Sequence, residues 1–110
     1  MLAALLPFVA TSANAADRLP QSMLGLWATE IAACMEQASE LVMTVEPRSV
    51  LFYEHGYEVK TIAKLKDGSL KASGYSVADD GRSRGSVTLK HVSADQLQIN
   101  GAQIYQRCKK

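Results

Sequence analysis

Serines and acidic residues are plentiful in this sequence, but no local pattern joins them to a histidine as a catalytic site would. The only histidines are His55 and His91. His55 stands beside Gly56 as a turn residue does, and His91 ends a strand-like run. Nucleophilic catalysis needs a serine or cysteine with a positioned base and an orienting acid, and no serine lies in a Gly-x-Ser-x-Gly motif. We therefore predict that the protein is not an enzyme and that it has no catalytic residues.

Motifs that bind metals or cofactors are also missing from the sequence. No His-x-His, His-Glu-x-x-His or Cys-x-x-Cys spacing occurs. Asp79 and Asp80 precede Gly81, but the other ligands of a calcium loop do not follow, so this segment is typical of a turn. The glycines are isolated and form no phosphate-cradling cluster. We predict no metal site and no cofactor.

The first fifteen residues, MLAALLPFVATSANA, have the pattern of a secretory signal. They carry no charge, contain an apolar run from Leu2 to Val9, and end in Ala13-Asn14-Ala15, a small-x-small cleavage motif. The run is too short for a transmembrane helix. We predict a signal peptide over residues 1–15, a single domain over residues 16–110 without a stable membrane span, and a periplasmic or secreted location in a bacterium.

Export makes a disulfide the expected state of the two cysteines. Cys34 and Cys108 are the only cysteines, and exported proteins meet an oxidising environment. A bridge between them would close most of the mature chain, and the chain-entropy model gives it about 4 kcal/mol of stabilisation. Charge gives no further indication of a partner, because 12 Lys and Arg oppose 11 Asp and Glu. We predict no binding to nucleic acid.

Apolar residues recur with a period of two in most of the chain, and turn residues separate the runs. This pattern predicts short β-strands joined by hairpins, with one short helical turn near residues 31–38. A long antiparallel meander tends to close because closure removes its exposed edges. We predict an all-β fold: a small antiparallel up-and-down barrel of about 7–8 strands with one disulfide. The strand-like runs are residues 24–29, 41–46, 50–54, 57–65, 70–78, 85–92 and the hairpin around residues 97–107.

Two strand segments allow a prediction of which side chains face inward. In residues 57–65, the side chains of Val59, Thr61, Ala63 and Leu65 should share one face, and the other face should be charged apart from Ile62. In the last hairpin, a two-residue Asn100-Gly101 turn should place Ile99 opposite Ala102 and Leu97 opposite Ile104, with Tyr105 and Arg107 on the other face.

The triplet Gly25-Leu26-Trp27, together with Arg107 near the end of the chain, resembles the signature of lipocalins and other calycins. The resemblance implies that Trp27 plugs one end of the barrel and that Arg107 lies across its indole. A guanidinium over an indole is a favourable cation–π pair, and Gly25 would leave room on the same face.

Two families of small secreted bacterial barrels share this plan. The chain resembles periplasmic inhibitors of secreted metalloproteases, in which an N-terminal arm blocks the protease, and residues 16–22 would form that arm. It is also similar to inhibitors of C-type lysozymes, whose loop contains a Ser-Gly-x-x-Tyr segment, at Ser73-Gly74-Tyr75. The strand residues Phe52-Tyr53-Glu54 look like those of exported bacterial proteins that have no assigned activity.

These patterns favour a binding protein over an enzyme. Exposed tyrosines beside loops often anchor protein interfaces, and the alternative is that they are ordinary cross-strand partners. We predict a non-enzymatic protein that binds another protein, as an inhibitor of a lysozyme or secreted protease. The alternatives are a carrier of a small apolar ligand and a structural envelope protein. The candidate partner-binding residues are Tyr53, His55, Tyr57, Ser73, Gly74 and Tyr75.

Overall fold

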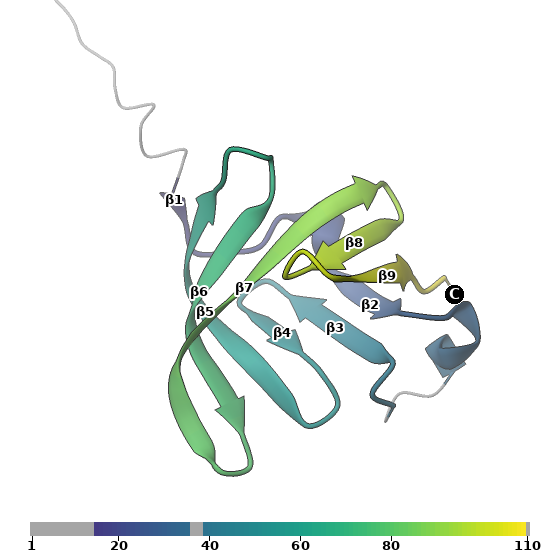
Figure 1. The fold of residues 1–110 in the computed structure, drawn as a ribbon, viewed down its shortest axis with the longest axis horizontal. Helices are drawn as coiled ribbons and strands as arrows, with labels where there is room; N and C mark the ends of the chain where they lie inside the picture. Colours follow the sequence, from purple (N-terminus) through teal and green to yellow (C-terminus); the bar gives the residue numbers. More distant parts are fainter. Residues whose placement is uncertain (1–14, 36–38, 110) are drawn as a thin grey trace, which may run out of the picture.

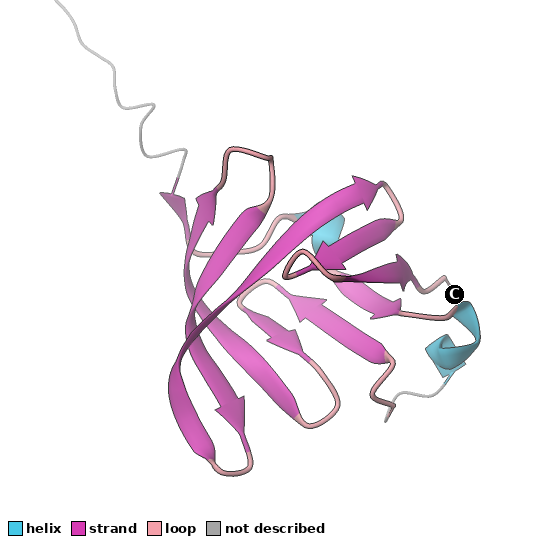
Figure 2. Ribbon diagram, in the orientation of Figure 1, coloured by secondary structure: helices cyan, strands magenta, loops and turns pink. Residues whose placement is uncertain are grey.

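The structure is a computed structural model, and it describes residues 15–35 and 39–109 of the chain. Of the predicted signal peptide, only Ala15 lies within the described residues. Figures 1 and 2 show a sheet that curls round on itself, with two short 3-10 helices beside it. The elements in chain order are β1 (Ala15–Ala16), η2 (Gln21–Met23), β2 (Gly25–Ala28), η3 (Ile31–Met35), β3 (Val42–Glu46), β4 (Ser49–Leu51), β5 (His55–Lys64), β6 (Leu70–Ala78), β7 (Gly81–Ser93), β8 (Gln96–Ile99) and β9 (Gln103–Arg107).

The strands β2 to β9 form a closed antiparallel barrel of eight strands. Each strand pairs with the next one along the chain, and β2 pairs with β9 to complete the ring. β1 adds two residues against β5, where Ala15 faces Ala63 and Ala16 faces Ile62. The predicted all-β barrel with a disulfide between Cys34 and Cys108 is therefore confirmed.

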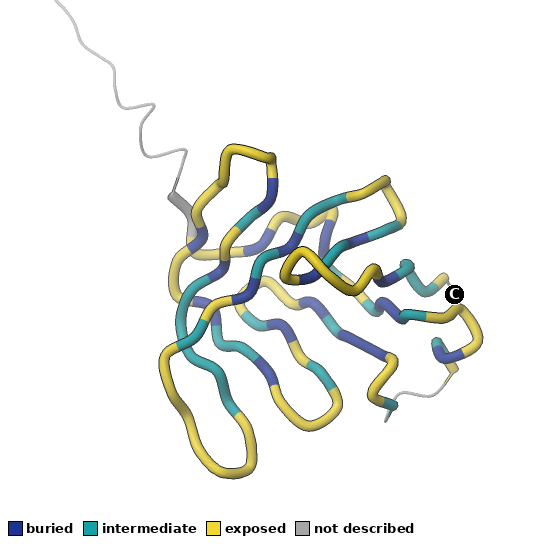
Figure 3. Tube along the Cα trace, in the orientation of Figure 1, coloured by how far each residue is buried: buried dark blue, intermediate teal, exposed yellow. Residues whose placement is uncertain are grey.

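Side chains fill the interior of this barrel. The largest fully buried ones are Trp27, Met43, Leu89, Leu97, Val45, Val50 and Val87. They come from β2, β3, β4, β7 and β8, and Figure 3 shows the buried residues as short dark blue stretches along the strands. A barrel of eight strands has room for packed side chains or for one small ligand, and here the side chains occupy that space.

The turns follow the local sequence signals. Asn100 and Gly101 have φ values of +54° and +69°, and the Ala102 N–H donates to the Ile99 carbonyl over 3.0 Å. Both positive φ values are those of a type I′ turn. Between β6 and β7 the turn is only Asp79 and Asp80, so β7 begins at Gly81, four residues earlier than predicted.

The predicted register of the β8–β9 hairpin is wrong by one residue. Ile99 pairs with Gln103 and Leu97 pairs with Tyr105, because Ala102 is an extra residue after the turn. A one-residue slip moves every side chain of a strand to the opposite face. Tyr105 is consequently buried, at 7% exposure, and Ile104 points outward at 37%.

A second irregularity corrects the predicted faces of β5. The register shifts between Val59 and Thr61, which leaves Lys60 as an additional residue in the strand. Such a bulge reverses the alternation beyond it. Val59 and Ile62 are therefore both buried, whereas Thr61 and Ala63 are exposed.

The segment before β2 packs on the barrel and is not a projecting arm. Leu19 is 4% exposed, and its N–H donates to the Pro47 carbonyl over 2.7 Å. Met23 of η2 is also buried. The expectation of an N-terminal arm at residues 16–22 is wrong, because the apolar side chain of Leu19 gains more from burial than from exposure to water.

The connection between β2 and β3 contains the predicted helical turn in part. It forms the 3-10 helix η3 over Ile31–Met35, and residues 36–38 of the prediction lie outside the described residues. The described residues contain no helix with the length and apolar character needed to cross a membrane.

Candidate functional site

One end of the barrel is closed by Trp27. Consecutive antiparallel strands alternate in direction, so the β3–β4, β5–β6 and β7–β8 turns share this end. The indole is fully buried, and its Nε1–H donates to the Met23 carbonyl over 3.0 Å. The Arg107 Cζ lies 4.3 Å from the centroid of the Trp27 ring, close enough for a cation–π contact.

Arg107 is itself held by several acceptors at the closed end. Its Nη2 donates to the Ser22 carbonyl over 2.6 Å, and its Nη1 donates to the Leu24 carbonyl over 3.2 Å. Asp95, from the β7–β8 turn, accepts from its Nε over 3.2 Å. Gly25 has a different role from the one predicted. Its φ is +122°, which favours glycine, and an added Cβ would have no neighbour closer than 3.9 Å.

The disulfide between Cys34 and Cys108 lies outside the barrel. The Cα atoms of Cys34 and Cys108 are 5.6 Å apart. Both cysteines pack against a small cluster of buried residues that is separate from the main core, formed by Ala28, Ala33 and Val42. The bridge therefore fastens the β2–β3 connection to the end of β9.

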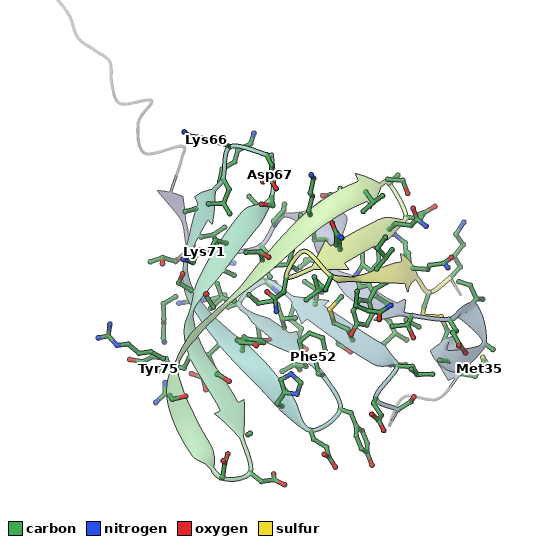
Figure 4. All side chains as sticks on the ribbon, viewed as in Figure 1. Met35, Phe52, Lys66, Asp67, Lys71 and Tyr75 are labelled. Carbon is green, nitrogen blue, oxygen red and sulfur yellow. A yellow bond between two sulfur atoms is a disulfide. The ribbon has the colours of Figure 1, made fainter. Side chains whose placement is uncertain are left out.

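The other end of the barrel has an open pocket with a volume of about 490 Å³, which we call the open-end pocket. The β4–β5 and β8–β9 turns form much of its rim. Phe52, labelled in Figure 4, contributes its ring and also packs against the main core. The lining residues are Glu40, Phe52, Tyr53, Glu54, His55, Tyr57, Ile99, Asn100, Ala102, Gln103 and Tyr105.

Aromatic rings in the open-end pocket contact one another. The Phe52 and His55 rings are stacked, with centroids 4.8 Å apart and an interplanar angle of 12°. Tyr57 meets Phe52 edge-on at 6.3 Å, and Tyr105 lies 6.2 Å from Phe52. Tyr53 stands beside this cluster with 51% of its surface exposed. The pocket thus presents a fixed aromatic surface with one exposed tyrosine at its rim.

The charged side chains of the open-end pocket are acidic. Glu40 and Glu54 line it, and no lysine or arginine is among its lining residues. Carboxylates beside aromatic faces favour a cationic group, because both attract positive charge.

Burial raises the pKa of the Tyr105 hydroxyl above its usual value. Burial therefore favours the neutral hydroxyl of Tyr105 in the folded protein. The stability that the buried, neutral Tyr105 contributes is complete below about pH 10 and is lost as the pH rises through the folded pKa. We expect the free energy of unfolding to fall more steeply above about pH 10 in the wild type than in a Tyr105→Phe variant. Urea unfolding at about pH 8 and about pH 11 would measure the difference, and parallel losses in the two proteins would contradict it.

The other three predicted partner-binding residues lie in a separate depression on the outside of the barrel. Ser73, Gly74 and Tyr75 of β6 line a groove of about 460 Å³, which we call the outer groove. Its other lining residues are Lys60, Thr61, Lys71, Arg84, Gly85 and Ser86. The structure therefore divides the predicted residues, with Tyr53, His55 and Tyr57 in the open-end pocket and the rest in the outer groove.

Sequence reasoning missed several residues of both surfaces. The predicted register places Tyr105 on the wrong face, and Glu40 of the β2–β3 connection and Gln103 of β9 are distant in sequence and meet only in the closed barrel. The sequence did contain a pattern that could have identified one cation of the outer groove, Lys71. Lys71 alternates with Ser73 and Tyr75 on one face of a strand, and a period of two places all three on the same side.

One contact resembles part of a catalytic arrangement. The Ser22 hydroxyl and the His91 Nε2 are 3.1 Å apart, and the His91 Nδ1 lies 3.1 Å from the Ser93 carbonyl. A hydrolytic site also needs a substrate pocket and donors for an oxyanion. Neither Ser22 nor His91 lines the open-end pocket or the outer groove. Among residues 15–35 and 39–109, no group of three or more His, Cys, Asp or Glu side chains is placed to hold a metal ion.

The geometry thus offers two surfaces, an acidic aromatic pocket and a basic groove, on different parts of one barrel. Comparison with models of protein families, with curated proteins and with solved structures found no match to this chain.

Proposed function

We propose that this chain is an exported, non-enzymatic binding protein that recognises another protein through the open-end pocket. The observation that carries the proposal is the cluster of partly exposed aromatic rings above a filled interior. Aromatic side chains at the centre of an interface contribute much of its binding energy. Because the barrel interior is occupied by its own side chains, binding takes place at the mouth.

The charge of the open-end pocket indicates the chemistry of the partner. Glu40 and Glu54 line the same pocket as the stacked rings of Phe52 and His55. A lysine or arginine side chain can lie over an aromatic face and bond to a carboxylate at the same time. We infer that the partner inserts a basic side chain, carried on a loop, into this pocket.

The proposed partner is an exported hydrolase, a lysozyme or a secreted protease, which the bound protein would inhibit. An oxidising compartment supports this setting, because the disulfide is formed there and is rare in the cytosol. A periplasmic or secreted location and removal of residues 1–15 as a signal peptide belong to the same proposal.

Inhibition assays on a panel of C-type lysozymes and secreted metalloproteases test this function. We expect the oxidised protein of residues 16–110 to inhibit at least one panel member at micromolar concentration. A Tyr53→Ala/His55→Ala variant should weaken inhibition at least about tenfold, because it removes two aromatic contacts from the pocket. Tyr75→Ala, which removes a tyrosine outside the pocket, is the matched control and should inhibit as the wild type does.

Two results would contradict the proposal in different ways. Absence of inhibition and binding over the whole panel at about fifty micromolar would remove the inhibitor function, since micromolar affinity corresponds to about 8 kcal/mol. The carrier alternative predicts instead that fatty acids or retinoid-like compounds alter the emission of Trp27, the lone tryptophan in the barrel interior. We expect no change, because packed side chains surround this indole.

A further inference from the structure

The charged side chains that line the outer groove are all cations. Lys60, Lys71 and Arg84 all line it, and none of its lining residues is acidic. The whole chain has nearly balanced charge, at +1. Three cations around one depression therefore form a local positive field that the overall composition does not explain.

These three cations have no acidic partner within the part of the chain that the structure describes. The ion pairs found there join Arg82 to Glu58, Lys90 to Asp67, and both Arg107 and Lys109 to Asp95. Arg82 lies only two residues from Arg84 and is neutralised by Glu58 over 2.8 Å. Arg84, Lys60 and Lys71 keep their donors available to a ligand.

The shape of the groove comes from the backbone of β5, β6 and β7. The bulge at Lys60 turns both Lys60 and Thr61 outward, so two consecutive side chains line the groove. Beneath them Gly74 pairs with Gly85, and a Cβ on Gly74 would overlap the Glu58 carbonyl oxygen. The close approach of the strands at this point requires glycine.

Hydroxyl groups and one aromatic ring complete the groove. Thr61, Ser73 and Ser86 line it beside the cations. The Tyr75 ring is held by Arg82, whose Cζ lies 4.1 Å from the ring centroid. Figure 4 shows Lys71 and Tyr75 on the side of the molecule opposite Met35. The ring is therefore placed beside the cations before any ligand arrives.

We propose that the outer groove binds a phosphorylated or sulfated saccharide. The tetrahedral oxyanion accepts hydrogen bonds from Lys60, Lys71 and Arg84, which are stronger than neutral hydrogen bonds because the partners are charged. The sugar ring packs against Tyr75, and its hydroxyls bond to Ser73 and Ser86. This site lies outside the open-end pocket and has the opposite charge, so it is independent of the proposed protein-binding function.

Heteronuclear NMR titration of the oxidised protein tests this site. Glucose 6-phosphate and glucose 6-sulfate should each shift amides of β5, β6 and β7 around the groove in a saturable way, and the relative strength of the two distinguishes phosphate from sulfate as the preferred group. Glucose and inorganic phosphate are the separate halves of the ligand, and each should bind at least about tenfold more weakly than the ester that joins them.

Charge variants localise the binding. Lys71→Gln/Arg84→Gln should weaken glucose 6-phosphate binding at least about tenfold. The matched control is Arg48→Gln/Lys66→Gln, which removes the same charge from exposed residues outside the groove and should bind as the wild type does. Tyr75→Leu should reduce the affinity for glucose 6-phosphate to that for inorganic phosphate. Lys60→Gln provides a second groove variant if the double variant does not fold.

Several results would overturn the proposal. Shifts that do not saturate, or an equal loss in the groove variant and the matched control, would mean that the cations act only as a diffuse charge. Inorganic phosphate binding as tightly as glucose 6-phosphate would remove the saccharide from the site. Binding to vesicles of anionic lipid without any response to the sugar esters would make the groove a membrane contact.

Discussion

Replacing Trp27 with alanine should lower the free energy of unfolding by about 3–5 kcal/mol, the range for truncating a large buried aromatic side chain. The indole is fully buried in the main core, donates a hydrogen bond to the Met23 carbonyl, and lies under the Arg107 guanidinium. Truncation would leave a cavity at the closed end and leave that carbonyl without its donor. Urea denaturation followed by far-ultraviolet circular dichroism would measure the loss.

A conservative variant separates packing from the polar contacts of the indole. Trp27→Phe keeps most of the volume and an aromatic face for Arg107, so its loss should be clearly smaller than that of Trp27→Ala. Arg107→Ala in both backgrounds gives the coupling between the two side chains, which we expect to be about 0.5–2 kcal/mol. A Trp27→Ala protein as stable as the wild type would contradict the role of the indole in closing the barrel.

Removal of the disulfide should have a comparably large effect. The Cys34→Ala/Cys108→Ala variant should lose about 4 kcal/mol, because the reduced unfolded chain regains the entropy of a long open loop. Domains of this size have total stabilities of about 5–15 kcal/mol, so this is a large share. Denaturant midpoints of the oxidised protein, the reduced protein and the double variant would measure it.

The reduced wild type and the Cys34→Ala/Cys108→Ala variant are controls for each other, because both lack the disulfide. The reduced wild type and the double variant should have similar midpoints, both well below that of the oxidised protein. Binding at the open-end pocket should persist in the variant under conditions where it is folded, since neither cysteine lines that pocket. Equal midpoints for oxidised and reduced protein would show that the bridge does not stabilise the fold.

The architecture could be predicted because the signals that specify it are local. Alternating apolar residues mark strands, and pairs such as Asn100-Gly101 mark tight turns between them. Hairpins between consecutive strands leave few possible topologies, and closure follows from the need to cover the two edges. The disulfide followed from the expectation of export. None of these inferences required knowledge of a distant contact.

The errors arose where one extra residue changed the face of a strand. Lys60 is the additional residue in β5 and Ala102 is the additional residue before β9. Strict alternation carries no sign of such a residue. Burial in the barrel interior selects the register of each strand, because Ile62 and Tyr105 become buried only when their strands slip by one position. The predicted arm failed in a similar way, since Leu19 belongs to the main core and its N–H bonds to the carbonyl of Pro47, which is distant in sequence.

The candidate sites were only partly predictable for the same reason. Tyr53, His55 and Tyr57 are close in sequence, and their common location could be expected from the β4–β5 turn. Phe52 and Glu54 come from the same turn, whereas the other residues of the open-end pocket come from the β2–β3 connection and the β8–β9 hairpin. Their proximity depends on closure of the ring. The positive charge of the outer groove likewise depends on the pairing of β5, β6 and β7, because each of these strands contributes one of its three cations.

The seam between β2 and β9 is the shortest in the barrel, and it has only two register pairs, Trp27 with Arg107 and Ala28 with Gln106. A ring of hydrogen-bonded strands opens most readily at its shortest seam, by local fluctuations that need not unfold the whole domain. Here the Cys108 N–H continues the seam by donating to the Leu26 carbonyl over 2.9 Å, and its side chain is bonded to Cys34. The disulfide thus joins η3, which follows β2, to the end of β9, beside the barrel seam that has the fewest register pairs. We therefore expect the backbone amides of this seam to exchange in the oxidised protein only when the surrounding barrel opens with them, and to be the first to exchange in the reduced protein.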